Sequence, residues 1–132
     1  MAVTVSWLFP QRVVFVRYNG QVTLDDVQAQ VRQTEAALAE GEPPVHFVID
    51  TTGIDKYDLS LSEIRAAFPG HDPKIGWTVV YGPNRITRFF ASILMQLVKS
   101  QFQFVESHDE ALIFLAHNDQ RLANPPRALT PK

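Results

Sequence analysis

The chain has 132 residues, 45% of them hydrophobic, which fits one compact domain able to bury its own core. Its formal net charge of −2 argues against nucleic acid and anionic membranes as general partners, because both attract concentrated positive charge. The absence of cysteine excludes disulfides, thiol catalysis and cysteine-ligated zinc. Neither a secretion signal nor a membrane-spanning apolar run is visible, so we expect a cytoplasmic protein with no transmembrane segment.

The N-terminal residues predict a β-hairpin. Residues 3–9 alternate roughly between apolar and polar side chains, and residues 12–18 are mostly β-branched and aromatic. Asn19 and Gly20, a common turn dipeptide, follow the second run. We therefore expect a strand over each run, with the second strand ending at that turn.

A helix and a third strand come next. Thr23 can cap a helix over residues 24–40, because its hydroxyl can accept a hydrogen bond from a free backbone N–H. Asp25 and Asp26 are favoured beside the positive end of the same helix. Residues 45–50 are too few and too β-branched to favour a helix, and they predict the third strand.

The middle of the chain predicts two further helices around a fourth strand. Ser60 and Glu63 have the spacing of a capping box and predict the start of a short helix. Residues 75–81 are rich in β-branched and aromatic side chains and predict the fourth strand. Asn84 can cap a third helix that runs to about residue 100.

The C-terminal part predicts a fifth strand, a last helix and a tail. Residues 102–106 form the predicted strand, and Ser107 with Glu110 repeats the capping-box spacing at the start of the last helix. Residues 118–132 contain several prolines and have no sustained periodicity. We expect a domain over residues 1–117 and a Pro-rich flexible tail after it.

The predicted order is β-β-α-β-α-β-α-β-α, which indicates an α/β domain with a single mixed, mostly parallel five-stranded sheet. Only the first strand is expected to be antiparallel. If successive strands are neighbours, right-handed crossovers place the helices on one side of the sheet. Phe47 and Val79 should then share that apolar face, while His46 and Val48 lie on the second, thinly covered face.

This order resembles that of the SpoIIAA-like branch of the STAS superfamily, which is often grouped with lipid-binding CRAL-TRIO domains. The likeness covers about residues 3–117 and includes "VRYNGQVTLDD" before the first helix, "VIDTTGID" at the end of the third strand and "WTVVYGPNR" before the third helix. It implies a SpoIIAA-like fold and a non-enzymatic switch of the anti-sigma-antagonist type. Such switches are regulated by phosphorylation of a serine where the loop after the third strand enters its helix.

Ser60 occupies roughly that place in this chain, within "DKYDLSLSEI". One interpretation is a helix cap, because Ser60 and Glu63 alone account for the capping-box pattern. The other is a regulatory phosphosite, because a phosphate at a helix N-terminus meets free N–H groups and a favourable dipole. Both remain open at this level.

Two loops that follow parallel strands are candidate ligand sites, since open α/β sheets bind ligands at the carboxyl ends of their strands. Thr51 and Thr52 belong to the first loop. Asn84, Arg85 and Arg88 belong to the second, where helix N–H groups and two arginines could hold a carboxylate or phosphate.

The predicted third helix has an apolar arc of about 240°, against the roughly 100° that a helix on one sheet needs. Neighbouring helices could cover its flanks. Alternatively, the surplus forms a homodimer surface or an apolar groove, since a large exposed apolar patch is uncommon on a monomer. The residues in question are Phe90, Leu94, Met95 and Val98.

No pattern in the chain indicates a reaction. A G-x-S-x-G sequence is absent, and the four histidines lack the spacing of metal ligands, so we expect no catalytic residue, no metal and no cofactor. The predicted function is a non-enzymatic regulatory or protein-interaction module that forms a homodimer. The alternative is a carrier of a small apolar ligand or lipid, with its anion site at the start of the third helix.

Overall fold

The computed structural model describes residues 3–58, 60, 62–63, 66, 73–82 and 101–122. Most of the predicted second helix and all of the third therefore lie outside the described residues. The described elements are β1 (Val3–Phe9), β2 (Val13–Thr23), α1 (Leu24–Glu40), β3 (Val45–Asp58), β4 (Ile75–Tyr81), β5 (Gln101–Val105), α4 (His108–Asn118) and the 3-10 helix η1 (Gln120–Leu122).

The five strands form one mixed sheet in the order β1-β2-β3-β4-β5. β1 pairs with β2 in the antiparallel direction, and every later pair is parallel, as the sequence predicted. α1 also has its predicted bounds. Thr23 caps it, with the Thr23 hydroxyl accepting from the Asp26 N–H and the Asp26 carboxylate accepting from the Thr23 N–H.

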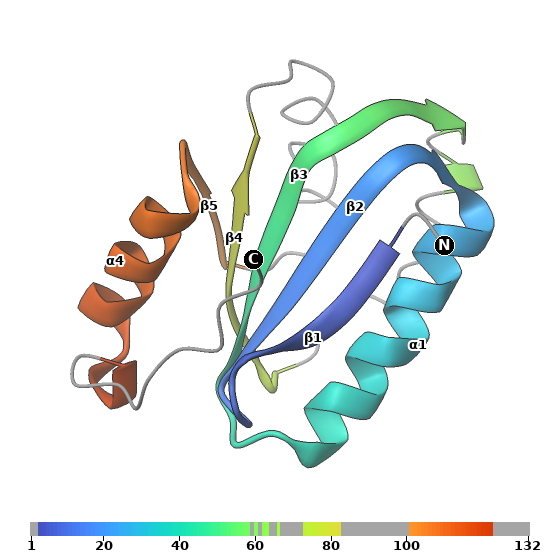
Figure 1. Cartoon of the computed structure of the whole chain (residues 1–132). Helices are drawn as coiled ribbons and strands as arrows, with labels where there is room; N and C mark the ends of the chain where they lie inside the picture. Colours follow the sequence, from blue (N-terminus) through green and yellow to red (C-terminus); the bar gives the residue numbers. More distant parts are fainter. Residues whose placement is uncertain are drawn as a thin grey trace.

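The described helices cover both faces of the sheet, so the expectation that all helices lie on one side is wrong. α1 packs beside β1 and β2 on one face, whereas α4 lies on the other face (Figure 1). The handedness rule applies only to a helix that connects two parallel strands, and α1 is such a helix. No strand follows α4 in the described chain, so α4 is free to pack on the second face, with Ala111 and Leu115 fully buried there.

Phe47 and Val79 lie on opposite faces, contrary to the prediction that they share one. Phe47 belongs to the cluster under α1, and Val79 belongs to the cluster under α4. The reason is an irregularity in the pairing of β3 with β4: Val45 pairs with Ile75, but Phe47 pairs with Thr78. This shift of one residue reverses the faces that simple alternation predicts.

β2 and β3 are both longer than predicted. Asn19 and Gly20 form no turn between strands. They lie inside β2, where the pairing with β3 is irregular on either side of them and Gly20 has φ of +70°. A glycine with positive φ is typical of a bulge, in which a strand bends and continues. β3 correspondingly runs on through Thr51 and Thr52, which the sequence had suggested were in a loop.

The C-terminal segment also differs from the expected tail. Asn118 still belongs to α4, and residues 120–122 form η1, with Leu122 only 2% exposed in the cluster under α4. The packed domain therefore extends at least through residue 122 rather than ending at residue 117. The rest of the predicted tail lies outside the described residues.

Candidate functional site

Ser60 lies two positions after the end of β3 in the chain and is exposed at the surface. The Ser60 N–H donates to the Glu63 carboxylate at 2.9 Å, and the Ser60 Oγ accepts from the Glu63 N–H at 3.2 Å. This is the reciprocal capping box that the sequence predicted. The Ser60 Oγ also lies 3.1 Å from the hydroxyl of Ser62. Capping and exposure coexist, so the hydroxyl stays accessible while it stabilises the local backbone.

An open groove of about 230 Å³ lies beside this capping box. One wall comes from the first turns of α1 and the other from the segment that begins at Ser60. The lining combines apolar side chains with polar ones. The lining residues are Leu24, Gln28, Ser62, Glu63 and Ala66.

In the middle of β3, three residues with polar groups form a row across β2, β3 and β4. Arg17 pairs in register with Asp50, and Asp50 with Tyr81. The Arg17 Nε donates to the Asp50 Oδ2 at 3.3 Å, and the Asp50 side chain is only 7% exposed. The Arg17 guanidinium also lies over the Phe15 ring, 5.4 Å from its centroid. The sequence had not predicted this ion pair.

The hydroxyls of Thr51, which is buried, and of Thr52, which is exposed, both donate to other groups of the chain. The buried Thr51 donates to the carbonyl of Tyr81 at 2.8 Å. The Thr52 N–H and hydroxyl both donate to the Oδ1 of Asp50, at 2.9 and 2.6 Å. These bonds join β3 to β4 and hold the Asp50 carboxylate in position, which is a structural use of both residues.

Tyr81 and His108 meet where β4 ends and α4 begins. The Tyr81 hydroxyl lies 3.1 Å from the His108 Nδ1, and the two rings pack edge to face. Burial, followed by the negative charge of Asp50, raises the pKa of Tyr81 above its usual range, so Tyr81 stays protonated at neutral pH. The Nε2 of His108 is buried and has no hydrogen-bond partner among the described residues.

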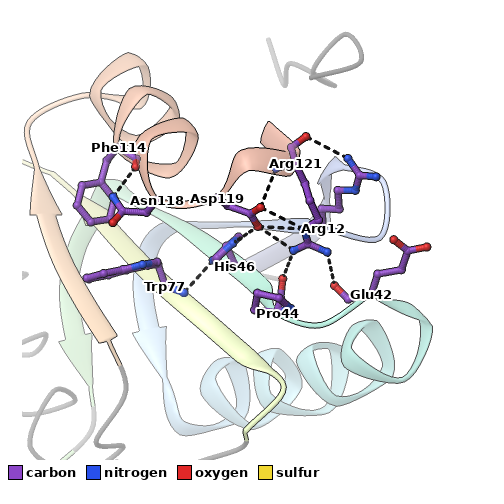
Figure 2. Close-up of polar contacts among 9 residues, drawn as sticks. All are labelled: Arg12, Glu42, Pro44, His46, Trp77, Phe114, Asn118, Asp119 and Arg121. Atoms are coloured by element: carbon purple, nitrogen blue, oxygen red, sulfur yellow. Dashed lines mark hydrogen bonds and ion pairs between the residues drawn. The ribbon is translucent and has the colours of Figure 1, made fainter. Parts of the chain in front are cut away.

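A second polar network occupies the opposite end of the sheet (Figure 2). His46, almost fully buried near the start of β3, has its Nε2 2.8 Å from the Oδ2 of Asp119. The Trp77 N–H donates to the His46 Nδ1 at 2.8 Å, at the position where the β3–β4 pairing is irregular. Because Nδ1 accepts this bond, the neutral ring carries its proton on Nε2 and donates it to Asp119.

Arg121 completes this network. Its Nε and Nη2 donate to the Asp119 carboxylate, while Nη1 and Nη2 also donate to the carbonyls of Glu42 and Pro44. Arg12 in turn donates to the Arg121 carbonyl at 3.1 Å. Burial lowers the pKa of His46, against the opposing effect of Asp119. Burial would raise the pKa of Asp119, but hydrogen bonds from Arg121 and His46 outweigh it and lower that pKa well below its usual range.

Sequence reasoning missed this network, although one signal was present. His46 interrupts an apolar strand, and a buried polar side chain needs a partner. The partners themselves, Asp119 and Arg121, were assigned to the tail.

The other predicted site residues lie outside the described residues. They are Asn84, Arg85 and Arg88 of the anion loop and Phe90, Leu94, Met95 and Val98 of the apolar helix face. Within the described ranges, no group of three or more histidine, aspartate or glutamate side chains is placed to hold a metal ion. Among the helices described, none is long and apolar enough to cross a membrane.

The chain resembles known proteins in its structure, not through a sequence match. No protein-family model matches the sequence, and no curated protein matches it. Solved structures do match. One is an uncharacterized protein of the DUF3478 family with a SpoIIAA-like fold from Shewanella loihica, 19% identical, covering 86% of this chain and 92% of that one with a TM-score of 0.64.

Two anti-sigma factor antagonists match as well. SpoIIAA in its unphosphorylated form is 16% identical, and the match covers 88% of this chain and 97% of that chain with a TM-score of 0.59. An anti-sigma factor antagonist from Mycobacterium paratuberculosis is 19% identical, and the match covers 86% of this chain and 94% of that chain with a TM-score of 0.54. At identities this low the likeness concerns the fold, and the sheet order with its antiparallel first strand agrees with it. The chain has a SpoIIAA-like fold.

Proposed function

We propose that this protein is a non-enzymatic regulatory module that binds a protein partner at the surface beside Ser60. Two of the similar structures are anti-sigma factor antagonists, which supports a role in protein interaction rather than in catalysis. The two polar networks of the sheet, one around Asp50 and one around Asp119, agree with this proposal. The Asp50 and Asp119 carboxylates are each held by an arginine and further internal donors, so neither is presented to a substrate.

The observation that carries the proposal is the exposed Ser60 hydroxyl next to an open groove. Leu24, Gln28 and Ser62 line the groove and provide contact area for a partner. Ser60 precedes Ser62 by two positions, and the two hydroxyls are in contact, so Ser60 lies beside the groove. A partner side chain resting in this groove would touch both α1 and the segment after β3. A modification of Ser60 would then alter the surface that the partner contacts.

We further propose that phosphorylation of Ser60 controls this contact. The Ser60 N–H is bound by the Glu63 carboxylate, so a phosphate on the same residue would bring like charges together. Repulsion would displace Glu63, which lines the groove. The added charge therefore alters the shape and the electrostatics of the binding surface in one step.

A homodimer through the apolar face of the predicted third helix is a separate proposal. It rests on the surplus of apolar side chains in that helix, which would otherwise need a covering. Leu94→Glu tests it, because a charge in a self-complementary apolar surface should convert a dimer to a monomer in sedimentation velocity. Unchanged sedimentation of a folded Leu94→Glu protein would remove the proposal.

Site-specific photo-crosslinking tests the partner surface. A photoreactive amino acid replaces Gln28 or Ser62 in cells of the source organism, and Ile113, exposed on the far helix α4, serves as the matched control. We expect one protein to be cross-linked at both groove positions and not at Ile113. Its capture should be lost when Ser60→Asp is added. Equal capture at all three positions, or capture that ignores Ser60→Asp, would overturn the proposal.

A further inference from the structure

β1 is an edge strand, and its outer side has no strand partner among the described residues. It pairs with β2 alone and lies at the opposite side of the sheet from β5 (Figure 1). The backbone N–H and C=O groups along such an edge are open to another strand. The outer side of β1 is therefore a place where a second chain can extend the sheet.

β1 lacks the features with which proteins usually protect an edge strand. Neither a charged residue nor a proline occurs between Val3 and Phe9. The pairing of β1 with β2 has one irregularity, between Trp7 and Phe9, at the end of the strand. A bulge at this place disturbs regular pairing only locally. Residues 3–7 therefore form a regular, uncharged edge.

The residue classes along this edge have the same order from either end. Val3, Val5 and Trp7 point toward α1, where Val5 and Trp7 are only half-buried. Thr4 and Ser6 alternate with them, so they point to the other face, and both are exposed. The edge thus has apolar side chains on one face and hydroxyls on the other, arranged symmetrically about Val5.

This symmetry makes the edge complementary to a second copy of itself. In an antiparallel pairing centred on Val5, the two Val5 side chains lie opposite each other. Thr4 of each copy then faces Ser6 of the other, and Val3 faces Trp7 in the same way. Pairs of hydroxyl side chains and pairs of an aromatic with a β-branched side chain stabilise neighbouring strands. No unlike or like-charged pair arises in this register.

The helix above the edge is compatible with the same pairing. α1 packs over β1 and β2, so pairing of two β1 edges brings two α1 helices side by side on one face of the joined sheet. Leu24 and Gln28 line the groove on the flank of α1 that faces the segment after β3. At 3.6 residues per turn, the opposite flank, toward the β1 edge, carries Ala29, Gln33 and Ala36. These side chains are short or uncharged, which allows two helices to approach closely.

We propose that β1 is a self-pairing edge, through which two copies of this chain join their sheets with Val5 on the two-fold axis. A second copy fits better than an unrelated strand because the edge is complementary to itself on both faces. Pairing covers Val5 and Trp7 further. The regular edge is short, so the pairing is reversible and depends on protein concentration. It leaves the groove beside Ser60 open and is independent of a dimer through the predicted third helix.

Disulfide cross-linking of the full chain tests both the pairing and its register. The chain has no cysteine, so an introduced thiol reports one position. Val5→Cys should form a disulfide-linked dimer, because Cβ atoms of directly opposed residues lie about 5 Å apart. Thr4→Cys should link poorly to itself but readily to Ser6→Cys when the two proteins are mixed. Ile113→Cys, at an exposed position on α4, is the control for chance collisions.

We expect Val5→Cys to cross-link about tenfold faster than Ile113→Cys, because pairing raises the effective concentration of the two thiols. Equal rates would overturn the proposal. Thr4→Cys that links to itself as fast as Val5→Cys would exclude the proposed register. Cross-linking of Val5→Cys to a different protein instead of a second copy would also contradict self-pairing. If Val5→Cys does not fold, the mixture of Thr4→Cys and Ser6→Cys decides between the same outcomes.

Exchange of charges tests the same contact through the same readout. Adding both Thr4→Lys and Ser6→Lys to Val5→Cys places like charges opposite each other, so cross-linking should fall to the rate of Ile113→Cys. Thr4→Glu with Ser6→Glu should have the same effect. Mixing the lysine and glutamate proteins should restore the fast rate, and a mixture that stays slow would contradict the pairing. Leu94→Glu should leave the rate of Val5→Cys unchanged, and a slow rate there would assign the cross-link to the third helix instead.

Discussion

The Nε2 of His46 lies 2.8 Å from the Oδ2 of Asp119, although 73 positions separate the two residues in the sequence. Both side chains are almost fully buried, with exposed fractions of 2% and 8%. This contact joins the segment after α4 to the start of β3. It also supports the irregular pairing of β3 with β4, since the His46 Nδ1 accepts the Trp77 N–H there.

Removing the Asp119 carboxylate should weaken the fold strongly. Asp119→Ala leaves the buried His46 donor without its acceptor and Arg121 without its counter-charge, and we expect a loss of about 3 kcal/mol in the free energy of unfolding. Urea denaturation measures this loss. Asp55→Ala, at an exposed position in β3, is the matched control and should change the stability little. Equal losses in the two variants would show that the Asp119 contacts do not stabilise the domain.

The free energy of unfolding should fall as the pH falls below neutral. The pKa of His46 is lowered in the folded state, so the unfolded chain binds more protons as the pH drops below 6.5. The contribution of His46 to the free energy of unfolding is complete above pH 6.5 and is lost as the pH falls through the lowered pKa of the folded state. Asp119 adds a separate loss of stability only below its usual pKa of 3.8, because its pKa in the folded state is also lowered.

Urea denaturation at about pH 7.5 and about pH 5 isolates the His46 effect. Wild type should lose stability between these conditions, and His46→Gln should lose less because it has no titrating ring. The matched control His117→Gln replaces an exposed histidine and should behave as wild type. The same pH dependence in wild type and His46→Gln would assign the effect to other groups.

Gly76→Ala should disturb the His46 ring. The new Cβ would lie 2.5 Å from Nδ1 and 2.6 Å from Cε1, so the ring or the strand has to move, at about 2 kcal/mol. Gly20→Ala is the comparison, because no atom lies within 4 Å of a Cβ there and only its positive φ opposes the change, at about 1 kcal/mol. Thermal unfolding ranks the two variants, and a Gly76→Ala protein as stable as wild type would contradict the observed packing.

Substitutions at Ser60 should separate capping from regulation. Ser60→Ala removes the acceptor for the Glu63 N–H and should cost about 1 kcal/mol of stability. Ser60→Asp keeps an acceptor for the Glu63 N–H but places a second carboxylate beside that of Glu63, so thermal unfolding should detect a smaller loss than in Ser60→Ala. If Ser60→Asp is as destabilising as Ser60→Ala, loss of partner capture in Ser60→Asp could no longer be attributed to charge.

Local patterns predicted most of the sheet and its order. Thr23 with Asp26 and Ser60 with Glu63 form caps within one helical turn, so their sequence spacing was informative. The position of α4 was not predictable from crossover handedness, because that rule requires a following strand. The faces of β3 were predicted correctly, but Val79 and Tyr81 of β4 were placed on the wrong face, because a single irregularity in the pairing shifts β4 by one residue and leaves no mark in the residue pattern.

The polar contacts inside the fold were much harder to predict. Arg17 binds Asp50 across 33 positions and His46 binds Asp119 across 73, and nothing local relates the members of either pair. Thr51 and Thr52 were predicted to lie in a loop, whereas pairing with the bulged end of β2 extends β3 through them. Tertiary pairing overrode turn propensity at this position.

The most direct test of the proposed function is the affinity of the cross-linked partner, once purified, for protein with and without phosphate on Ser60. Isothermal titration calorimetry of the unmodified chain, the Ser60-phosphorylated chain and Ser60→Ala supplies the three dissociation constants. The proposal predicts that the phosphate changes the dissociation constant by about tenfold or more, whereas Ser60→Ala binds like the unmodified chain. Equal affinity of the phosphorylated and unmodified chains would contradict a switch at Ser60.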